Sequence, residues 1–190
     1  MVVKNFILAS CSSQRYALLK QIGYEPQFVE AANIDEAPHK FERPTEYVKR
    51  MAKEKALSVA ARHPDQVVLA GDTVISVGKR ILQKAPNPEE QKKVMRLLSG
   101  KAHKVLSGVC VVSPGGRIAV KCVMTRIVMK KLTEKEINDY VATNEWVGCA
   151  GYKIEGCLAG FVQKIIGSYS SVVGLPLFEV RNMLNGAGVR

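Results

Sequence analysis

The hydrophobic pattern begins with a short apolar run, residues 6–9, which predicts a first β-strand. A serine-rich turn follows, and apolar side chains then recur at helical spacing from Tyr16 onward. Ser12 lies where a helix N-cap is expected, and Gly23 lies where the helix should stop. The apolar stretch at the start is too short for a secretory signal, so we interpret it as this first strand.

The remainder of the chain mixes helices with long β segments. Helices are predicted where a proline or a Thr-x-x-Glu capping box provides a start: from Pro44, at 88–98 and at 133–143. Two β-hairpins are predicted: residues 67–77 with a turn into 80–83, and residues 103–113 with 117–130 around Pro114-Gly115-Gly116. The C-terminal part is predicted to contain a strand at 160–166, then the segment 168–177 and a short helix to Leu184. Antiparallel hairpins mixed with helices favour an α+β (mixed α/β) fold over a purely doubly wound one.

The composition is that of an ordinary globular chain. Its 190 residues fit a single domain, 1–190, with 47% apolar and 24% charged residues. No apolar run approaches the roughly 20 residues of a membrane span, so no membrane partner is expected. The five cysteines contain no C-x-x-C pair and the three histidines stand apart. This pattern disfavours a disulfide framework or a histidine-based zinc site and is typical of a reducing, cytoplasmic setting.

Charge narrows the class of partner. The formal net charge is +11, which favours an anionic substrate or partner. Nucleic acid is disfavoured, because aromatic residues make up only 6% of the chain and are not interleaved with long basic blocks. A generally basic, solvated surface stays open as the plainer interpretation.

The turn from Ser10 to Arg15 is the first candidate for chemistry. Backbone N–H groups at a helix N-terminus bind phosphate, and the serine hydroxyls and the Arg15 guanidinium could add further donors. An ordinary N-cap beside a solvated arginine is the structural alternative.

Asp72 is the second candidate, because it interrupts a segment that otherwise predicts a buried strand. Burying a carboxylate is costly unless it is paired, hydrogen-bonded or bound to a metal. An aspartate at a strand end, satisfied by backbone amides, is the alternative, but such polar interruptions of a core strand are typical of functional sites.

A group of cations forms the third candidate. Lys55 lies on a predicted buried helix face, Lys84 follows a strand end, and Lys79–Arg80 occupies a predicted hairpin. Each alone is typical of a solvated surface, whereas a phosphate-rich substrate with an acid and a metal ion would account for them together. A P-loop is excluded, because six residues separate Gly71 from Gly78 instead of four, and no Ser or Thr follows the lysine.

Seven motifs, in the right order from about residue 6 to residue 185, closely resemble those of the Maf family. They are Leu8-Ala-Ser-Cys-Ser-Ser-Gln-Arg15 with Leu18-Leu19, Ile34-Asp-Glu36, Tyr47 through Lys55-Ala56, Gly71-Asp-Thr-Val74, Leu98-Ser-Gly100 with His103 and Ser107-Gly-Val109, Ala150-Gly-Tyr152 through Gly156, and Gly167-Ser-Tyr169 through Leu177. The resemblance implies the fold of inosine-triphosphate pyrophosphatases: an elongated mixed sheet flanked by helices, with a cleft between two lobes.

The same resemblance implies an activity. It is hydrolysis of nucleoside triphosphates, including non-canonical or modified house-cleaning substrates, between the α- and β-phosphates with Mg²⁺ or Mn²⁺, and a homodimer is possible. Asp72 would be the general base, and Glu36 would serve catalysis and, with Asp72, the metal. Lys55 and Lys84 would act at the phosphates as catalytic residues. The remaining expected substrate-binding residues are Ser10, Ser12, Gln14, Arg15, Thr73 and Glu155.

Departures from the family pattern leave the base open. The branch that prefers dTTP and UTP usually has Arg at the position of Gln14 and Gln at that of Glu155, whereas Glu155 resembles the branch acting on 7-methyl-GTP. A carboxylate only accepts hydrogen bonds, which favours a base that presents donors, such as guanine. Ala85 also replaces the proline that commonly follows Lys84. Two functions from other classes remain as alternatives: a nucleotide-binding regulatory protein without turnover, and a nucleic-acid-binding module that rests on net charge alone.

Overall fold

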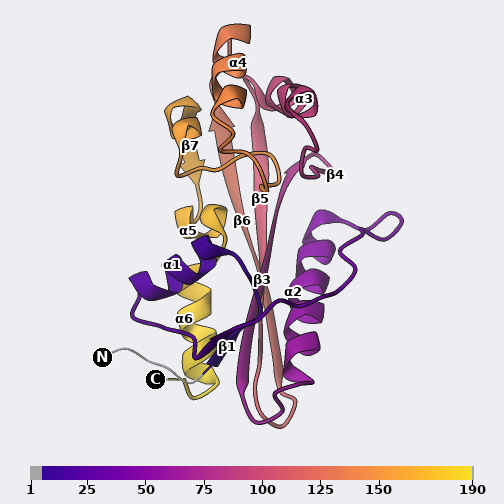
Figure 1. Ribbon diagram of the computed structural model, residues 1–190, viewed down its shortest axis with the longest axis vertical. Coiled ribbons are helices and arrows are strands. Elements are labelled where there is room, and N and C mark those ends of the chain that lie inside the picture. The colour runs from indigo at the N-terminus through magenta and orange to yellow at the C-terminus, as the bar shows by residue number, and fades with distance from the viewer. Residues whose placement is uncertain (1–5, 190) are drawn as a thin grey trace.

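The computed structural model describes residues 6–189, which form a sheet of seven strands with helices on both faces (Figure 1). The strands are β1 (Phe6–Leu8), β2 (Phe28–Val29), β3 (Val67–Val77), β4 (Arg80–Ile81), β5 (Ala102–Val112), β6 (Ile118–Met129) and β7 (Val162–Ile166). The helices are α1 (Ser13–Gln21), α2 (Pro44–Ala60), α3 (Pro88–Leu98), α4 (Glu134–Ala142), the 3₁₀ helix η1 (Cys157–Phe161), α5 (Tyr169–Val173) and α6 (Leu177–Gly186). Residues 1–5 and residue 190 lie outside the described residues, whereas the predicted first strand lies within them.

The sheet is mixed, as predicted. Its order is β2-β1-β3-β5-β6-β7, with β4 paired to β3 off this path. β1 runs parallel to both of its neighbours, whereas all other pairs are antiparallel. The expected α+β arrangement of an elongated mixed sheet flanked by helices is therefore confirmed.

Helices cover both faces of one half of the sheet. α2 packs through Met51, Ala52 and Ala56 on one face of β3 and β5. Side chains of α1 and α6, including Leu19 and Leu184, pack on the opposite face. Figure 1 shows this half at the bottom, with α2 on one side of the sheet and α1 and α6 on the other.

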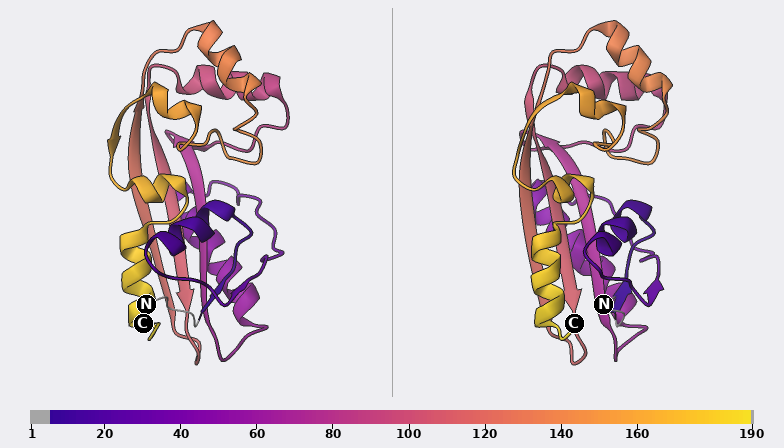
Figure 2. Two further views of the ribbon diagram at one scale, coloured as in Figure 1. Left: turned by 60° about the vertical axis from the view of Figure 1, so that its left-hand side comes forward. Right: turned by 90° about the vertical axis from the view of Figure 1, so that its left-hand side faces the viewer.

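The other half of the sheet forms a second lobe. There α3, α4 and η1 bury a separate core against β3, β5 and β6, which contains Met95, Leu98, Ile137 and Tyr140. Figure 2 shows α3 and α4 together at the upper end of the long strands, away from α1 and α2. The long strands β3, β5 and β6 thus connect two separately packed lobes.

Most predicted elements lie where the pattern placed them. β3 and α3 have the predicted bounds. The strand predicted at 160–166 begins only at Val162, because η1 occupies the preceding residues. The last helix continues to Gly186 instead of ending at Leu184. None of the helices formed by residues 6–189 combines the length and the apolar character that a bilayer-spanning segment needs.

A glycine in β5 sets the distance between α2 and the sheet. A Cβ atom at Gly108 would collide with the backbone carbonyl oxygen of Val48 in α2. Gly108 pairs in register with Asp72 of the neighbouring strand β3. The close approach that this glycine permits therefore brings α2 directly beside Asp72.

Candidate active site

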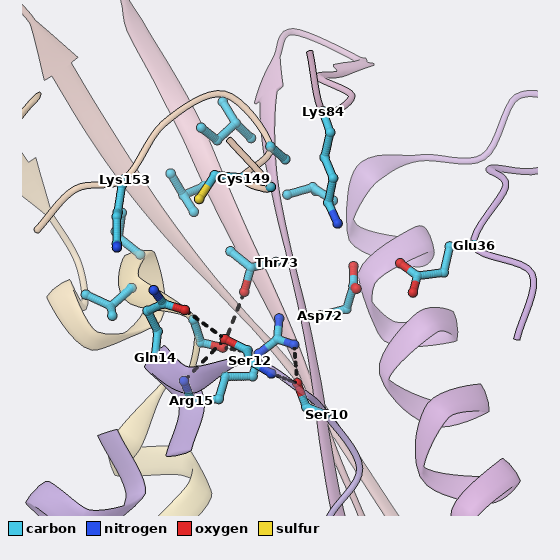
Figure 3. Close-up of a pocket in the computed structure, with 18 of the residues that line it drawn as sticks. Ser10, Ser12, Gln14, Arg15, Glu36, Asp72, Thr73, Lys84, Cys149 and Lys153 are labelled. Carbon is cyan, nitrogen blue, oxygen red and sulfur yellow. Dashed lines mark hydrogen bonds between the residues drawn. The ribbon is translucent and has the colours of Figure 1, made fainter. Parts of the chain in front are cut away.

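A cavity of about 820 Å³ opens between the two lobes, and most of the residues singled out from the sequence line it. Its walls come from the turn before α1, the segment after β2, the middle of β3, the residues after β4 and the segment 148–155. Figure 3 shows side chains from these segments pointing into the same space. Lys79 and Arg80, the hairpin cations, are exposed and do not line this cavity.

Two carboxylates and one lysine form the floor of the cavity. Lys55 Nζ lies 2.7 Å from Asp72 Oδ1 and 3.0 Å from Glu36 Oε1. Asp72 is 6% exposed and Lys55 is 8% exposed, so the lysine compensates a carboxylate that would otherwise be costly to bury. Glu36 is more open to solvent, and Figure 3 shows its carboxylate facing that of Asp72.

Tyr47, a residue to which sequence reasoning gave no chemical role, supports this acidic pair. Its hydroxyl donates a 2.8 Å hydrogen bond to the backbone carbonyl of Glu36. Burial, reinforced by the negative charges of Asp72 and Glu36, raises the pKa of Tyr47 to about 12, so the hydroxyl stays a neutral donor. The available signal was its spacing: Tyr47 precedes Lys55 by eight residues, about two helical turns, on the same face of α2.

Arg15 carries a cation into the cavity from α1. Its Nε donates to the carbonyl of Gly174 at 3.1 Å, and Nη1 donates to Ser10 Oγ at 3.0 Å. Burial lowers the pKa of Arg15, while Asp72 and Glu36 act in the opposite direction. Gly71 keeps the space open, since a Cβ there would lie 2.9 Å from Leu175 and 3.5 Å from Arg15 Nε.

The turn before α1 has the predicted N-cap. Ser12 Oγ accepts from the backbone N–H of Arg15 at 3.4 Å, which confirms Ser12 as the cap. Its hydroxyl also donates to Gln14 Oε1 at 3.3 Å, and the hydroxyl of Ser13 donates to the same oxygen at 3.2 Å. The helix start thus lies at the cavity wall, where Ser10, Ser12 and Gln14 are among the lining residues.

Thr73 lies on the opposite face of β3 from Asp72. Its hydroxyl donates to Ser107 Oγ at 2.7 Å and lies 3.4 Å from the carbonyl oxygen of Gly174. Ser107 in turn donates to the carbonyl of Ser171 in α5. The structure thus places Thr73 at the cavity wall within a hydroxyl network that connects β3, β5 and α5.

The remaining charged or reactive side chains of the cavity wall come from the upper lobe. Lys84 is exposed, and Figure 3 shows it reaching toward Asp72. Lys153, Glu155 and the half-buried Cys149 line the same cavity. Burial raises the pKa of Cys149, which keeps its thiol protonated. Sequence reasoning missed Lys153, because nothing in the neighbouring sequence distinguishes it from a solvated lysine.

The donor set at the floor fits a hard divalent cation. Within residues 6–189 no cluster of three or more His, Cys, Asp or Glu side chains could hold a metal alone. Mg²⁺, however, is typically bound by one or two carboxylates together with water and substrate phosphates. Asp72 and Glu36 provide such a pair, because both bind the same Lys55 ammonium.

Comparison with known proteins decides the family. The model of the family described as Maf-like protein matches residues 5–187. The chain belongs to the Maf family. The resemblance inferred from the seven motifs is thereby confirmed across nearly the whole chain.

This Maf-family chain has curated relatives of nearly equal length. It is 47% identical to a dTTP/UTP pyrophosphatase of Caulobacter vibrioides, over 97% of this chain and 96% of the relative. It is 49% identical to a dTTP/UTP pyrophosphatase of Sphingopyxis alaskensis, over 96% of each. Among solved structures, a dITP/XTP pyrophosphatase of Mycobacterium abscessus matches with a TM-score of 0.46 and 12% identity, over 97% of this chain and 96% of that one.

Proposed function

We propose that this chain is a nucleoside triphosphate pyrophosphatase that cleaves between the α- and β-phosphates and releases a nucleoside monophosphate and pyrophosphate. The observation that carries the proposal is the buried Asp72–Lys55 pair at the floor of a cavity that also holds Arg15 and Lys84. The names of the curated relatives, dTTP/UTP pyrophosphatases, support the same activity.

Asp72 is the general base in this proposal. Lys55 Nζ binds Oδ1, which fixes the orientation of the carboxylate and leaves Oδ2 to accept a proton from water. Glu36, on the same ammonium, completes the acidic pair. A divalent cation bound by these two carboxylates would supply charge neutralisation at the phosphate oxygens and a more acidic water.

The cations bind and orient the phosphates. Arg15 is held by Ser10 and by the carbonyl of Gly174, so its position is fixed before substrate arrives. Lys84 approaches from the opposite lobe and offers an ammonium on a flexible side chain. Phosphoryl transfer requires little more from a protein than this neutralisation and positioning.

For the base, we propose uracil and thymine, because all eight curated relatives compared are named for dTTP and UTP. Glu155 is the observation that favours the other candidate, 7-methyl-GTP, since it lines the cavity and its carboxylate only accepts hydrogen bonds. Comparison of kcat/KM on UTP between the wild type and Glu155→Gln separates the two. An unchanged kcat/KM in Glu155→Gln would exclude Glu155 from base recognition.

The first experiment is pyrophosphate release from UTP, dTTP, CTP, GTP, 7-methyl-GTP and ITP with Mg²⁺ or Mn²⁺. We expect turnover by the wild type, and a fall in kcat of about 100-fold or more for Asp72→Asn, the usual range for loss of a general base. Asp65→Asn, on the surface before β3, is the matched control and should retain activity. Nucleotide binding without turnover by the wild type would instead identify a regulatory binding protein.

A further inference from the structure

Lys153 is a cation of the cavity whose position is set by the fold. Residues 152–155 all contribute to the cavity wall: Tyr152 and Ile154 are buried, whereas Lys153 is half-buried and Glu155 is exposed. The chain turns at this point, since the backbone N–H of Gly156 donates to the carbonyl of Lys153 at 3.4 Å, and the buried side chains of Tyr152 and Ile154 fix the segment on either side of Lys153.

Buried contacts also hold the backbone on either side of Lys153. The hydroxyl of Tyr152 is hydrogen-bonded to His103 Nε2 at 2.6 Å, inside the core of the upper lobe. The side-chain amide of Gln91 donates to the carbonyl of Gly151. Lys153 is therefore presented by an ordered segment, and no ion pair within residues 6–189 occupies its ammonium.

Gln14 faces Lys153 from the other wall. Figure 3 shows Lys153 extending toward Gln14, at the end of the cavity away from Glu36. The Oε1 of Gln14 accepts from the hydroxyls of Ser12 and Ser13, which leaves its Nε2 group to donate to a ligand. This end of the cavity thus combines an ammonium and an amide donor, a pair that suits an anionic oxygen.

We propose that Lys153 and Gln14 together bind the terminal phosphates of the substrate, which leave as pyrophosphate. This inference rests on the proposed function, in which Asp72 and Glu36 act at the opposite end of the cavity. A triphosphate attacked at that end extends its β- and γ-phosphates along the cavity, away from the acidic pair. Lys153 is thus a substrate-binding residue that orients the leaving group and takes no part in proton transfer.

The test is the affinity for inorganic pyrophosphate, measured by calorimetry with Mg²⁺, and kcat/KM on each triphosphate that the wild type hydrolyses. In Lys153→Met, we expect both to fall by about 10- to 100-fold, the range for one charged hydrogen bond, and to the same extent on every base. Because Gln14 faces Lys153, the double variant Gln14→Arg/Lys153→Met should recover most of the loss by supplying the cation from the other wall.

Lys164→Met, an exposed lysine on β7 outside the cavity, is the matched control and should leave pyrophosphate affinity unchanged. Three results would overturn the inference: unchanged pyrophosphate affinity in Lys153→Met, a loss restricted to one base, or a loss that the relocated cation does not reverse. If the wild type binds pyrophosphate through Lys153 but hydrolyses no triphosphate, the proposed function fails while this binding site stands.

Discussion

Ser107 shows what a single buried hydroxyl contributes to this site. It is fully buried, it donates to the carbonyl of Ser171, and it lies 2.7 Å from the Thr73 hydroxyl. Ser107→Ala would leave that carbonyl without its donor, so we expect a loss of roughly 1–3 kcal/mol in the free energy of unfolding. Urea denaturation measures it. Ser58→Ala, on the half-exposed side of α2, should change stability by less than about 0.5 kcal/mol. Equal losses in the two variants would contradict the prediction.

At the same scale, sequence reasoning finds residues that break a pattern and misses those that do not. Asp72 was predictable because a carboxylate inside an apolar strand needs a compensating partner, and Lys55 supplies it. Lys153 and Tyr47 were not predictable, because a lysine in a loop and a tyrosine on an apolar helix face are ordinary. Their proximity to the cavity depends on contacts between distant segments, which spacing along the chain does not encode.

Among the elements, the segment that connects Glu36 to α2 is held by one ion pair. Arg50 Nε lies 2.7 Å from Glu42 Oε1, and this hydrogen bond from Arg50 lowers the pKa of Glu42 to about 2. Because the pKa is lower in the folded protein than in the unfolded chain, the stabilisation is present above about pH 4.5 and is lost as the pH falls toward 2. We expect Glu42→Gln to lower the urea midpoint at pH 7 and the gap to the wild type to close near pH 2. Glu54→Gln, which removes the longer 3.2 Å contact with Arg50, is the control and should show a smaller gap. A gap independent of pH would contradict this assignment.

Helix starts in this chain were more predictable than element ends. Pro44, Pro88 and the Thr133 capping box are local signals that act on their own helix, and each marks a helix start in the structure. The 3₁₀ helix η1 has no comparable signal, and it displaces the start of β7. The end of α6 at Gly186 depends on the packing of Leu184 in the lower core. Ends set by packing require the tertiary structure.

The hydrophobic pattern along the chain did not predict how the strands are arranged in the sheet. Nothing local places β1 between β2 and β3, or pairs Asp72 with Gly108 across two long strands. The α+β class followed from hairpins mixed with helices, and the elongated sheet followed from resemblance to the Maf family. Candidate site residues from Ser10 to Glu155 converge on one cavity only because the long strands connect both lobes. This convergence depends on how strands distant in the sequence pair with one another, which a single sequence does not reveal.

The stability of the whole molecule should depend on one buried histidine in the upper lobe. His103 is 3% exposed, and burial lowers its pKa to about 4. The unfolded chain takes up a proton near pH 6.5 while the folded protein does not until about pH 4, so stability falls as the pH falls through this range. The difference corresponds to a loss of up to about 3 kcal/mol.

His103→Gln removes this titration, so its urea midpoint should lie below the wild type at pH 8, where the bond to Tyr152 is lost, and approach it near pH 4. His39→Gln, at an exposed site, should follow the wild-type curve at every pH. A stability curve for His103→Gln parallel to the wild type between pH 6.5 and 4 would show that the imidazole titrates in the folded protein, and that the core of the upper lobe admits its charge.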